Sequence, residues 1–162
     1  MSPVPLEVRV ATAGDAPAVA DLFYYTILHV NFGDYNASQV GAWAGPAPDP
    51  GLWVGRIAEH GGRRMFVATA QEEIVGFAEL EEDGHLDTLY VHHEHQGRGI
   101  ATALLDRIEA EARRLGLARL YTEASITAEP FFRAKGFSVV RPQLVELRGH
   151  SFRNFVMEKR GL

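Results

Sequence analysis

The 162-residue sequence contains no cysteine. That absence excludes disulfide bonds, thiolate metal sites and a cysteine nucleophile. Positive charge is also scarce, because 16 lysine and arginine residues stand against 21 aspartate and glutamate residues, for a net charge of −5. Proteins that bind nucleic acid or anionic membrane surfaces carry an excess of basic residues instead. We therefore expect neither nucleic acid nor a membrane among the partners.

Long apolar runs are missing too. No stretch approaches the roughly 18–20 apolar residues of a membrane-spanning helix, and residues 1–9 hold two prolines and no signal-peptide pattern. We expect a cytoplasmic location. A chain of 162 residues is long enough for one domain with a proper core and too short for two ordinary ones. We expect one domain over 1–162.

The glycine-containing segment 96–101, Gln-Gly-Arg-Gly-Ile-Ala, matches neither of two common nucleotide-binding motifs. The Rossmann fingerprint needs a third glycine where Thr102 stands, and no G-K-[S/T] triplet occurs anywhere in the chain. The segment nevertheless joins a strand-like run at 86–91 to a helical pattern. The first N–H groups of a helix are unpartnered and lie at its positive end, and glycines let a ligand approach the backbone. This predicts a phosphate or pyrophosphate site, with a plain tight turn as the alternative.

Hydrophobic periodicity predicts the order of elements along the chain. Strands are expected over 6–11, 65–70, 74–80, 85–91, 118–124, 139–147 and 152–157. Helices are expected over 15–30, 37–44, 52–60, 98–115 and 128–135. A helix that crosses between strands 86–91 and 119–124 implies that these strands run parallel in one sheet. The pattern is that of an α/β fold.

Two segments of the chain resemble signatures of the GNAT superfamily of N-acetyltransferases. Gln96, Gly99 and Ala101 match the pattern [Q/R]-x-x-G-x-[G/A], and residues 131–137 look like the family's F-Y-x-x-x-G-F segment. The resemblance covers about residues 65–159. It implies a GNAT-like mixed central sheet of about six to seven strands flanked by helices. It also implies that acetyl-coenzyme A (acetyl-CoA) lies between splayed parallel strands 4 and 5.

The resemblance implies where the cofactor is held. The pantetheine would pair with the backbone of Leu89, Tyr90 and Val91. The pyrophosphate would lie on the amides of Gln96, Gly97, Arg98, Gly99, Ile100, Ala101 and Thr102. The pantetheine and adenine end would be flanked by Ser125, Phe131, Phe132 and Lys135. Arg98 is either a charge-assisted phosphate contact or a solvated loop residue.

One position departs from the family pattern. The tyrosine that the family proposes as the acid for the leaving thiolate falls on Phe132, which has no proton to donate. Tyr90, Tyr121 and Tyr35 are possible replacements, and the sequence does not choose among them. A thiol with a pKa near 8.5 is already a fair leaving group, so catalysis does not require such an acid.

The reaction implied by the resemblance is direct attack of an amine on the thioester, and an ammonium with a pKa near 10.4 needs a base. Asp87 is our first candidate, followed by His85 and Glu79. Alternation places His85 and Asp87 on one face of the fourth strand, with Glu79 on its neighbour. The position of a well-known family base is His85. Asp87 could instead be a structural residue or an anchor for the substrate.

The acceptor pocket is expected in the aromatic N-terminal part of the chain, with Tyr24, His29, Tyr35 and Trp43 as its candidate residues. The histidines within 92–95 lack a helical i,i+4 pair and a second ligand cluster, so no metal site is expected. The sequence thus predicts an N-acetyltransferase that moves acetyl from acetyl-CoA to a primary amine of a small molecule or peptide, in a ternary complex. A non-catalytic acyl-CoA-binding regulatory or interaction module is the alternative, and a homodimer is possible.

Overall fold

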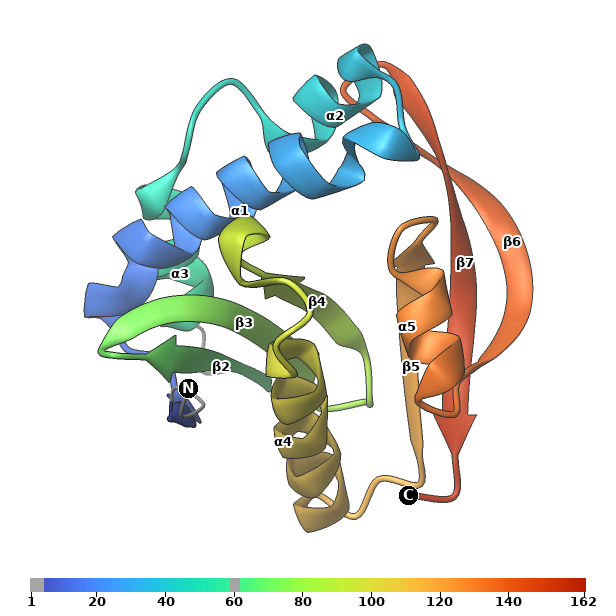
Figure 1. Cartoon of the computed structure of the whole chain (residues 1–162). Helices are drawn as coiled ribbons and strands as arrows, with labels where there is room; N and C mark the ends of the chain where they lie inside the picture. The colour runs from blue at the N-terminus through green and yellow to red at the C-terminus, as the bar shows by residue number, and fades with distance from the viewer. Residues whose placement is uncertain (1–4, 59–61) are drawn as a thin grey trace.

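The computed structural model describes residues 5–58 and 62–162, which form two antiparallel sheets and five α-helices (Figure 1). The first sheet has the strand order β1-β2-β3-β4 and the second the order β5-β7-β6. The strands are β1 (Leu6–Val10), β2 (Arg63–Ala70), β3 (Glu73–Glu81), β4 (Leu86–Val91), β5 (Arg119–Ser125), β6 (Ser138–Leu147) and β7 (His150–Arg160).

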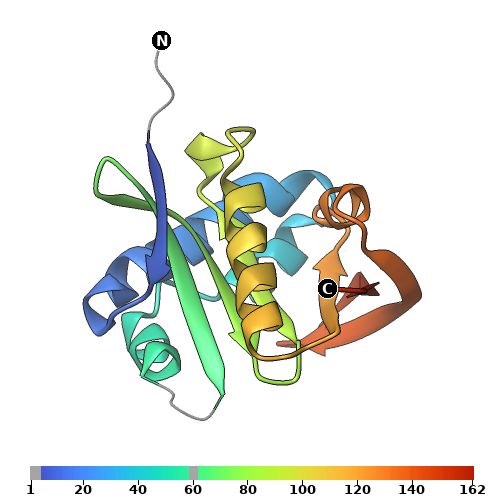
Figure 2. The same cartoon turned by 90° about the horizontal axis from the view of Figure 1, so that it is seen from below.

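Helices cover both faces of the first sheet. They are α1 (Ala16–Val30), α2 (Ala37–Ala44), α3 (Pro50–Ile57), α4 (Ile100–Arg114) and α5 (Glu129–Ala134), with short 3-10 turns at Ala13–Asp15, Asn31–Gly33 and His93–His95. α1 and α3 bury Leu22 and Trp53 against Val67 and Phe77 of one face. α4 covers the opposite face, as Figure 2 shows. None of the helices among the described residues is long and apolar enough to cross a membrane.

The predicted elements agree closely with those observed. Each predicted strand and helix is present, and most ends differ by one or two residues. The strand expected over 152–157 is longer, because the hairpin from β6 to β7 stays paired from Ser138 opposite Glu158 to Leu147 opposite His150. α3 begins at Pro50, two residues early, and ends at Ile57; the end predicted for it at residue 60 lies outside the described residues.

The expectation that 86–91 and 119–124 share one sheet is wrong in detail. β4 and β5 lie side by side only where both begin, and the described residues contain a single parallel bridge between the sheets, from His85 to Tyr121. His85 itself lies outside β4. At Leu86 the carbonyl accepts a hydrogen bond from the Thr122 hydroxyl at 2.8 Å, so a side chain takes the place of a backbone donor. Beyond it the two strands diverge (Figure 1).

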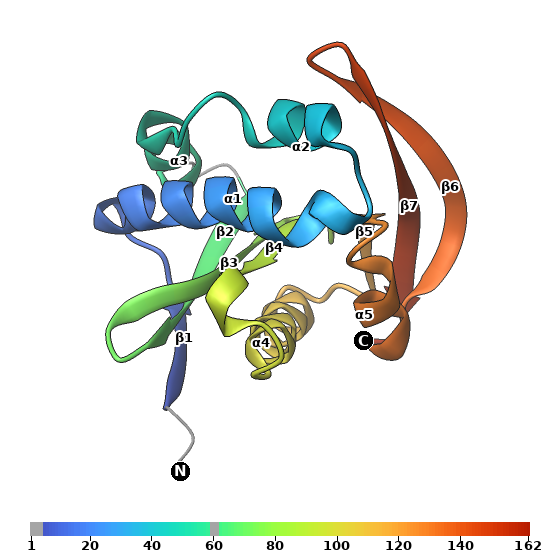
Figure 3. The same ribbon diagram turned by 45° about the horizontal axis from the view of Figure 1, so that its top comes forward.

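The N-terminal helices reach across the diverging strands to the second sheet. α1 crosses the open side of the gap, and α2 lies beside β7 (Figure 3). Tyr35, which follows α1, donates its hydroxyl to the carbonyl of Arg153 at 2.7 Å and accepts the amide of Ile126 at 2.9 Å. Asn31 likewise donates to Thr127 at 3.1 Å. These bonds connect the end of α1 to the second sheet and to the turn that follows β5.

Candidate functional site

The loop before α4 has the geometry that an anion site requires. Gly97 and Gly99 have φ values of 74° and 80°, in the left-handed region that favours glycine. A Cβ atom on either glycine would meet no described atom within 4 Å, so open space lies above both. The Gln96 side chain donates to the carbonyl of Val91 at 2.7 Å, which fixes the loop to the end of β4. Gly76 of β3 lets the first turn of α4 approach closely, because a Cβ there would lie 2.9 Å from Ile100.

A groove of about 170 Å³ runs from this loop into the gap between β4 and β5. Most predicted cofactor residues line it: Leu89, Tyr90, Val91, Gln96, Ala101, Ser125, Phe131 and Phe132. Ile100 is instead buried beneath the loop in the core, and Lys135 lies 5.8 Å from the Phe131 ring centroid. Residues that the sequence did not indicate complete the lining, among them Thr26 and Asn31 from the α1 side.

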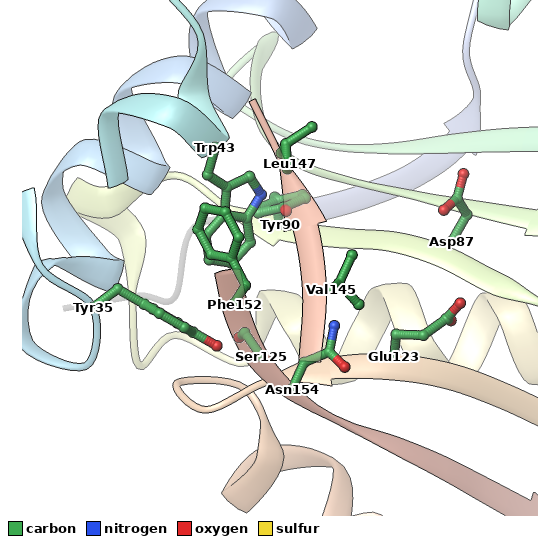
Figure 4. Close-up of a pocket in the computed structure, with 10 residues that line it drawn as sticks. All are labelled: Tyr35, Trp43, Asp87, Tyr90, Glu123, Ser125, Val145, Leu147, Phe152 and Asn154. Atoms are coloured by element: carbon green, nitrogen blue, oxygen red, sulfur yellow. The ribbon is translucent and has the colours of Figure 1, made fainter. Parts of the chain in front are cut away.

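A second cavity of about 200 Å³ lies on the other side of the gap (Figure 4). Its walls come from α2, β4, β5, β6 and β7, and the lining residues are Tyr35, Trp43, Asp87, Tyr90, Glu123, Ser125, Val145, Leu147, Phe152 and Asn154. Tyr90 and Ser125 line the groove as well as this cavity. A smaller space between β4 and β5 is also bounded by these two residues. The two cavities therefore meet across Tyr90 and Ser125.

Two of the four predicted acceptor residues line the second cavity. Tyr35 and Trp43 do so, with their rings 5.5 Å apart in an edge-to-face contact. Tyr24 packs in the same apolar cluster but is absent from the cavity lining. His29 lies elsewhere, because its ring stacks on His93 at 4.0 Å beside the glycine loop. The sequence did not indicate Glu123, although alternation along β5 would have placed it on the same face as Ser125.

Asp87 and Glu79 belong to a partly buried ion-pair network. Arg63 donates to Asp87 at 2.6 Å and to Glu79 at 3.1 Å, and Arg56 contacts both carboxylates. Burial acts to raise the pKa of Asp87, but the hydrogen bond from Arg63 and the charges of Arg56 and Arg63 outweigh it, and the pKa is lowered. Burial raises the pKa of Glu79, opposed by Arg56 and Thr88. Both oxygens of Glu79 accept bonds from cationic donors, which is the arrangement of an ionised carboxylate.

His85 is held between carboxylates from both sheets. Its two ring nitrogens lie 2.7 Å from a Glu81 oxygen and 2.6 Å from a Glu123 oxygen. Burial acts to lower the pKa of His85, but the bonds to Glu123 and Glu81 and the charge of Asp87 outweigh it and raise the pKa to about 9. His85 is therefore an imidazolium at neutral pH, with both N–H groups donating and no lone pair free to accept a proton.

We expect this imidazolium to make stability depend on pH. The pKa of His85 is raised from 6.5 to about 9 in the folded chain, so its contribution is complete below pH 6.5 and is lost as pH rises through about 9. The groups that face His85 are Glu81, Glu123, Asp87 and Asp83. His85→Gln should therefore lower the free energy of unfolding by on the order of 2 kcal/mol at pH 6 and by far less at pH 10. Urea unfolding across this range measures the difference.

His150→Gln is the control for that series, because His150 begins β7 in the hairpin, and its ring makes no hydrogen bond or ion pair with a described residue. It should leave the pH profile of the wild-type chain unchanged. A stability difference between wild type and His85→Gln that stays constant from pH 6 to pH 10 would show that the histidine acts through packing alone.

The three tyrosines considered as proton donors differ in their surroundings. The hydroxyls of Tyr35 and Tyr121 are occupied, since Tyr35 donates to the carbonyl of Arg153 and Tyr121 donates to Asp83. Tyr90 lines both cavities, and burial raises its pKa, so its hydroxyl stays protonated. Phe132 is buried and packs on Phe137 while also lining the groove.

Among residues 5–58 and 62–162, one group of side chains has a spacing that would suit a metal ion. Ligand atoms of Glu81, His85 and Asp87 lie within 4.8 Å of one another. Both nitrogens of His85 are already bound to carboxylates, however, and Asp87 is paired with Arg56 and Arg63. A metal ligand must offer a free lone pair, so this group does not fit a metal ion.

The sequence and the fold both match those of known proteins. A family model described as an acetyltransferase (GNAT) domain matches residues 32–159. The uncharacterized N-acetyltransferase YafP of Escherichia coli K12 is 33% identical over 153 residues, which cover 94% of each chain. A crystal structure from Rhodopseudomonas palustris, described as a GCN5-related N-acetyltransferase, is 32% identical with a TM-score of 0.90, covering 99% of this chain and 98% of that one. The PaiA N-acetyltransferase of Thermoplasma acidophilum, solved with coenzyme A, shares the fold at 18% identity, with a TM-score of 0.79 over 96% of this chain and 99% of that one.

Proposed function

Because the chain belongs to the GNAT family of acetyltransferases, we propose that it transfers the acetyl group of acetyl-CoA to a primary amine of a small molecule or peptide. The amine attacks the thioester directly in a ternary complex. The observation that carries this proposal is the pair of cavities that meet across Tyr90 and Ser125. One cavity takes the cofactor and the other takes the acceptor, so the two reacting groups come together in the gap between β4 and β5.

The proposed position of the cofactor depends on the edge of β4 that does not pair with β3. β4 is hydrogen-bonded to β3 on one side, and beyond His85 its other edge faces the groove. The pantetheine amides would pair with this edge at Leu89 to Val91 as an added strand does. The pyrophosphate would lie on the amides of 96–102, where left-handed glycines and the N-terminus of α4 favour negative charge. Ser125, Phe131, Phe132 and Lys135 would flank the rest of the cofactor.

We assign the proton-accepting role to Asp87 rather than to His85 or Glu79. Of the three candidates, Asp87 lines the acceptor cavity. His85 is an imidazolium and Glu79 is fully buried behind the two arginines. A carboxylate with a lowered pKa is a weak base, so it works best by relaying the proton to water. The thiolate leaves without an acid, because a thiol of pKa near 8.5 needs none.

Thiol release from acetyl-CoA in the presence of a panel of amines tests this function. Asp87→Asn should lower kcat by about 10²-fold and leave the KM for acetyl-CoA unchanged. Because the pKa of Asp87 is lowered and that of His85 is raised to about 9, no enzyme group should give an inflection in the kcat profile between pH 6 and pH 8. An inflection in this range that disappears in His85→Gln would transfer the base role to His85.

The alternative function is a non-catalytic acyl-CoA-binding module, and the observation that favours it is Phe132 in place of the family's tyrosine. The same assay separates the two. A chain that is stabilised by acetyl-CoA but releases no thiol above the rate without protein, with any amine of the panel, is a binding module.

A further inference from the structure

The acceptor cavity has a polar end and an apolar end. In Figure 4 the carboxyl groups of Asp87 and Glu123 lie at one end, while Trp43, Phe152 and Leu147 lie at the other. Tyr35, Trp43 and Phe152 pack edge to face or tilted, with ring centroids 5.5–6.0 Å apart, so the apolar wall is continuous. A ligand that fills this cavity meets charge at one end only.

The charge at the polar end does not come from Asp87. The Asp87 carboxylate and that of Glu79 behind it are both paired with Arg56 and Arg63, so two cations offset two carboxylates. A paired carboxylate in this position has little attraction left for a second cation. Asp87 therefore contributes little net field to the cavity.

Glu123 holds the surplus negative charge. Its partner among the described residues is His85, and that one imidazolium is shared with Glu81. Arg63 also lies 3.5 Å from Glu81. Among the described residues, these ion pairs thus join three cations, Arg56, Arg63 and His85, to the four carboxylates of Glu79, Glu81, Asp87 and Glu123. The bond from His85 reaches Oε2 of Glu123, and Oε1 has no hydrogen-bonding partner within the described part of the chain. The side chain keeps 39% of its surface exposed on the cavity side of β5.

A second hydrogen-bond acceptor without a partner lies beside Glu123. The Oδ1 atom of Asn154 is buried and has no hydrogen bond to any described residue. Asn154 pairs with Ser125 across β7 and β5, and Ser125 lies two residues from Glu123 on the same face. A buried hydrogen-bond acceptor that receives no hydrogen bond lowers the stability of the fold. The site therefore suits a ligand that donates an N–H bond at this point.

We propose that the acceptor is a primary amine with a single positive charge, an aromatic or aliphatic body and no carboxylate. This rests on the proposed function and names the substrate class of the same site. The ammonium donates to Glu123 and to Asn154 next to the β4–β5 gap, and the body packs on Trp43, Phe152 and Leu147. When one proton passes through water to Asp87, the nitrogen keeps two N–H bonds to Glu123 and Asn154. Its lone pair then forms the bond to the thioester carbon, the carbon–sulfur bond breaks, and coenzyme A leaves as the thiolate.

This charge balance rejects two other classes of amine. A polyamine would place its second ammonium among apolar side chains that offer no partner, and an unpaired buried charge is strongly disfavoured. An amino acid would bring a carboxylate next to Glu123, where the surplus charge repels it. Selectivity of this kind works by exclusion as much as by attraction.

The matched probes are 2-phenylethylamine, phenylalanine and 1,3-diaminopropane, compared by the rate of thiol release from acetyl-CoA. Phenylalanine differs from 2-phenylethylamine by its carboxylate, and the diamine replaces the ring by a second charge. We expect kcat/KM for 2-phenylethylamine to exceed both others by at least about tenfold, the effect of one hydrogen bond to a charged group. Equal or better use of phenylalanine or the diamine overturns the proposal.

Glu123→Gln identifies the residue responsible. It should lower kcat/KM for 2-phenylethylamine at least about tenfold and leave the stabilisation by acetyl-CoA unchanged. Glu146→Gln is the charge-matched control, because Glu146 lies on β6 between the cavity residues Val145 and Leu147 and faces away. Equal effects of the two variants would overturn the role of Glu123. Asn154→Leu gives a second route if Glu123→Gln fails to fold, and it should also weaken use of 2-phenylethylamine.

Failure of this inference is distinct from failure of the proposed function. Calorimetric titration of 2-phenylethylamine into the complex with coenzyme A measures acceptor binding without turnover. Binding to wild type that weakens in Glu123→Gln supports the inference even in a chain that releases no thiol. Thiol release with other amines, together with no binding of 2-phenylethylamine, overturns the inference and leaves the acetyltransferase standing.

Discussion

Gly99→Trp should abolish the stabilisation that acetyl-CoA gives to the wild-type chain. Binding to the native state alone raises stability by about 2.7 kcal/mol at a hundredfold excess over Kd, which for a chain of this size is roughly 5–10 °C in Tm. Gly99 caps α4 with a φ of 80°, and open space lies above it. An indole there fills the space proposed for the pyrophosphate. Thermal unfolding with and without saturating acetyl-CoA measures the loss.

Gly116→Trp is a matched control for this experiment. Gly116 follows the other end of α4, has a φ of 76° and likewise has no described atom within 4 Å of an added Cβ. The two variants therefore share a similar backbone strain of about 1–2 kcal/mol and differ in which end of the helix they block. The control should keep the full shift with acetyl-CoA. If Gly99→Trp keeps it too, the cofactor does not lie on this loop.

Glu79→Ala should be among the most destabilising single changes in the chain. Glu79 is completely buried, and its carboxylate faces Arg56 and Arg63 at distances of 2.9–3.1 Å. Removing one member of a buried ion-pair network leaves the other charges uncompensated, at a cost of about 3 kcal/mol once the partial exposure of both arginines is considered. Denaturant unfolding at pH 7 measures the change. Activity should fall as well, because both arginines also hold Asp87.

Glu129→Ala provides the comparison on the protein surface. Glu129 pairs with Arg133 within α5, and the arginine side chain is 69% exposed. Such a pair contributes at most about 1 kcal/mol, so its loss should be small. If Glu79→Ala costs no more than Glu129→Ala, the buried network contributes nothing to stability. Glu79→Gln, which keeps the shape and removes the charge, then distinguishes an electrostatic contribution from packing.

The elements that the sequence predicted well are those with a strong local signal. The apolar stripe of α4 repeats at helical spacing, and Gly99 and Gly116 mark its two ends. The turn between β6 and β7 is marked by Gly149. Both signals depend on neighbours in the chain, so one sequence is enough to read them. The glycine loop could be predicted for the same reason, whereas the other predicted residues of the groove were implied by the family resemblance.

The sheet arrangement could not be predicted in this way. Whether β4 and β5 pair along their length depends on groups far apart in sequence, such as Tyr35 and Ile126, whose hydrogen bond connects the end of α1 to the turn after β5. Hydrophobic patterning gives the same strand in either case. It therefore predicted two parallel neighbours in one sheet, and the divergence of their ends was implied by the family resemblance alone.

The ion-pair network around Asp87 and Glu79 could not be predicted from the sequence either. Arg56 and Arg63 come from α3 and β2, and no motif connects them with Asp87. The sequence ranked Asp87 ahead of His85 and Glu79 without any information on their charged partners. Only the folded chain places Arg56 and Arg63 on Asp87 and two carboxylates on His85. These contacts lower the pKa of Asp87 and raise that of His85.

The two cavities differ in what would happen to them over evolutionary time. The groove is bounded by β4 and by the start of α4, whose Ile100 and Leu104 belong to the main apolar core. Much of the wall of the second cavity, which we propose for the acceptor, comes from Trp43 of α2 and from the β6–β7 hairpin, which projects from the body of the molecule (Figure 3). Residues 138–152 of this hairpin contribute nothing to the main apolar core, unlike Met157 further along β7, so substitutions within 138–152 can accumulate without disturbing it. We therefore expect descendants of this chain to retain the groove and to vary the lining of the second cavity.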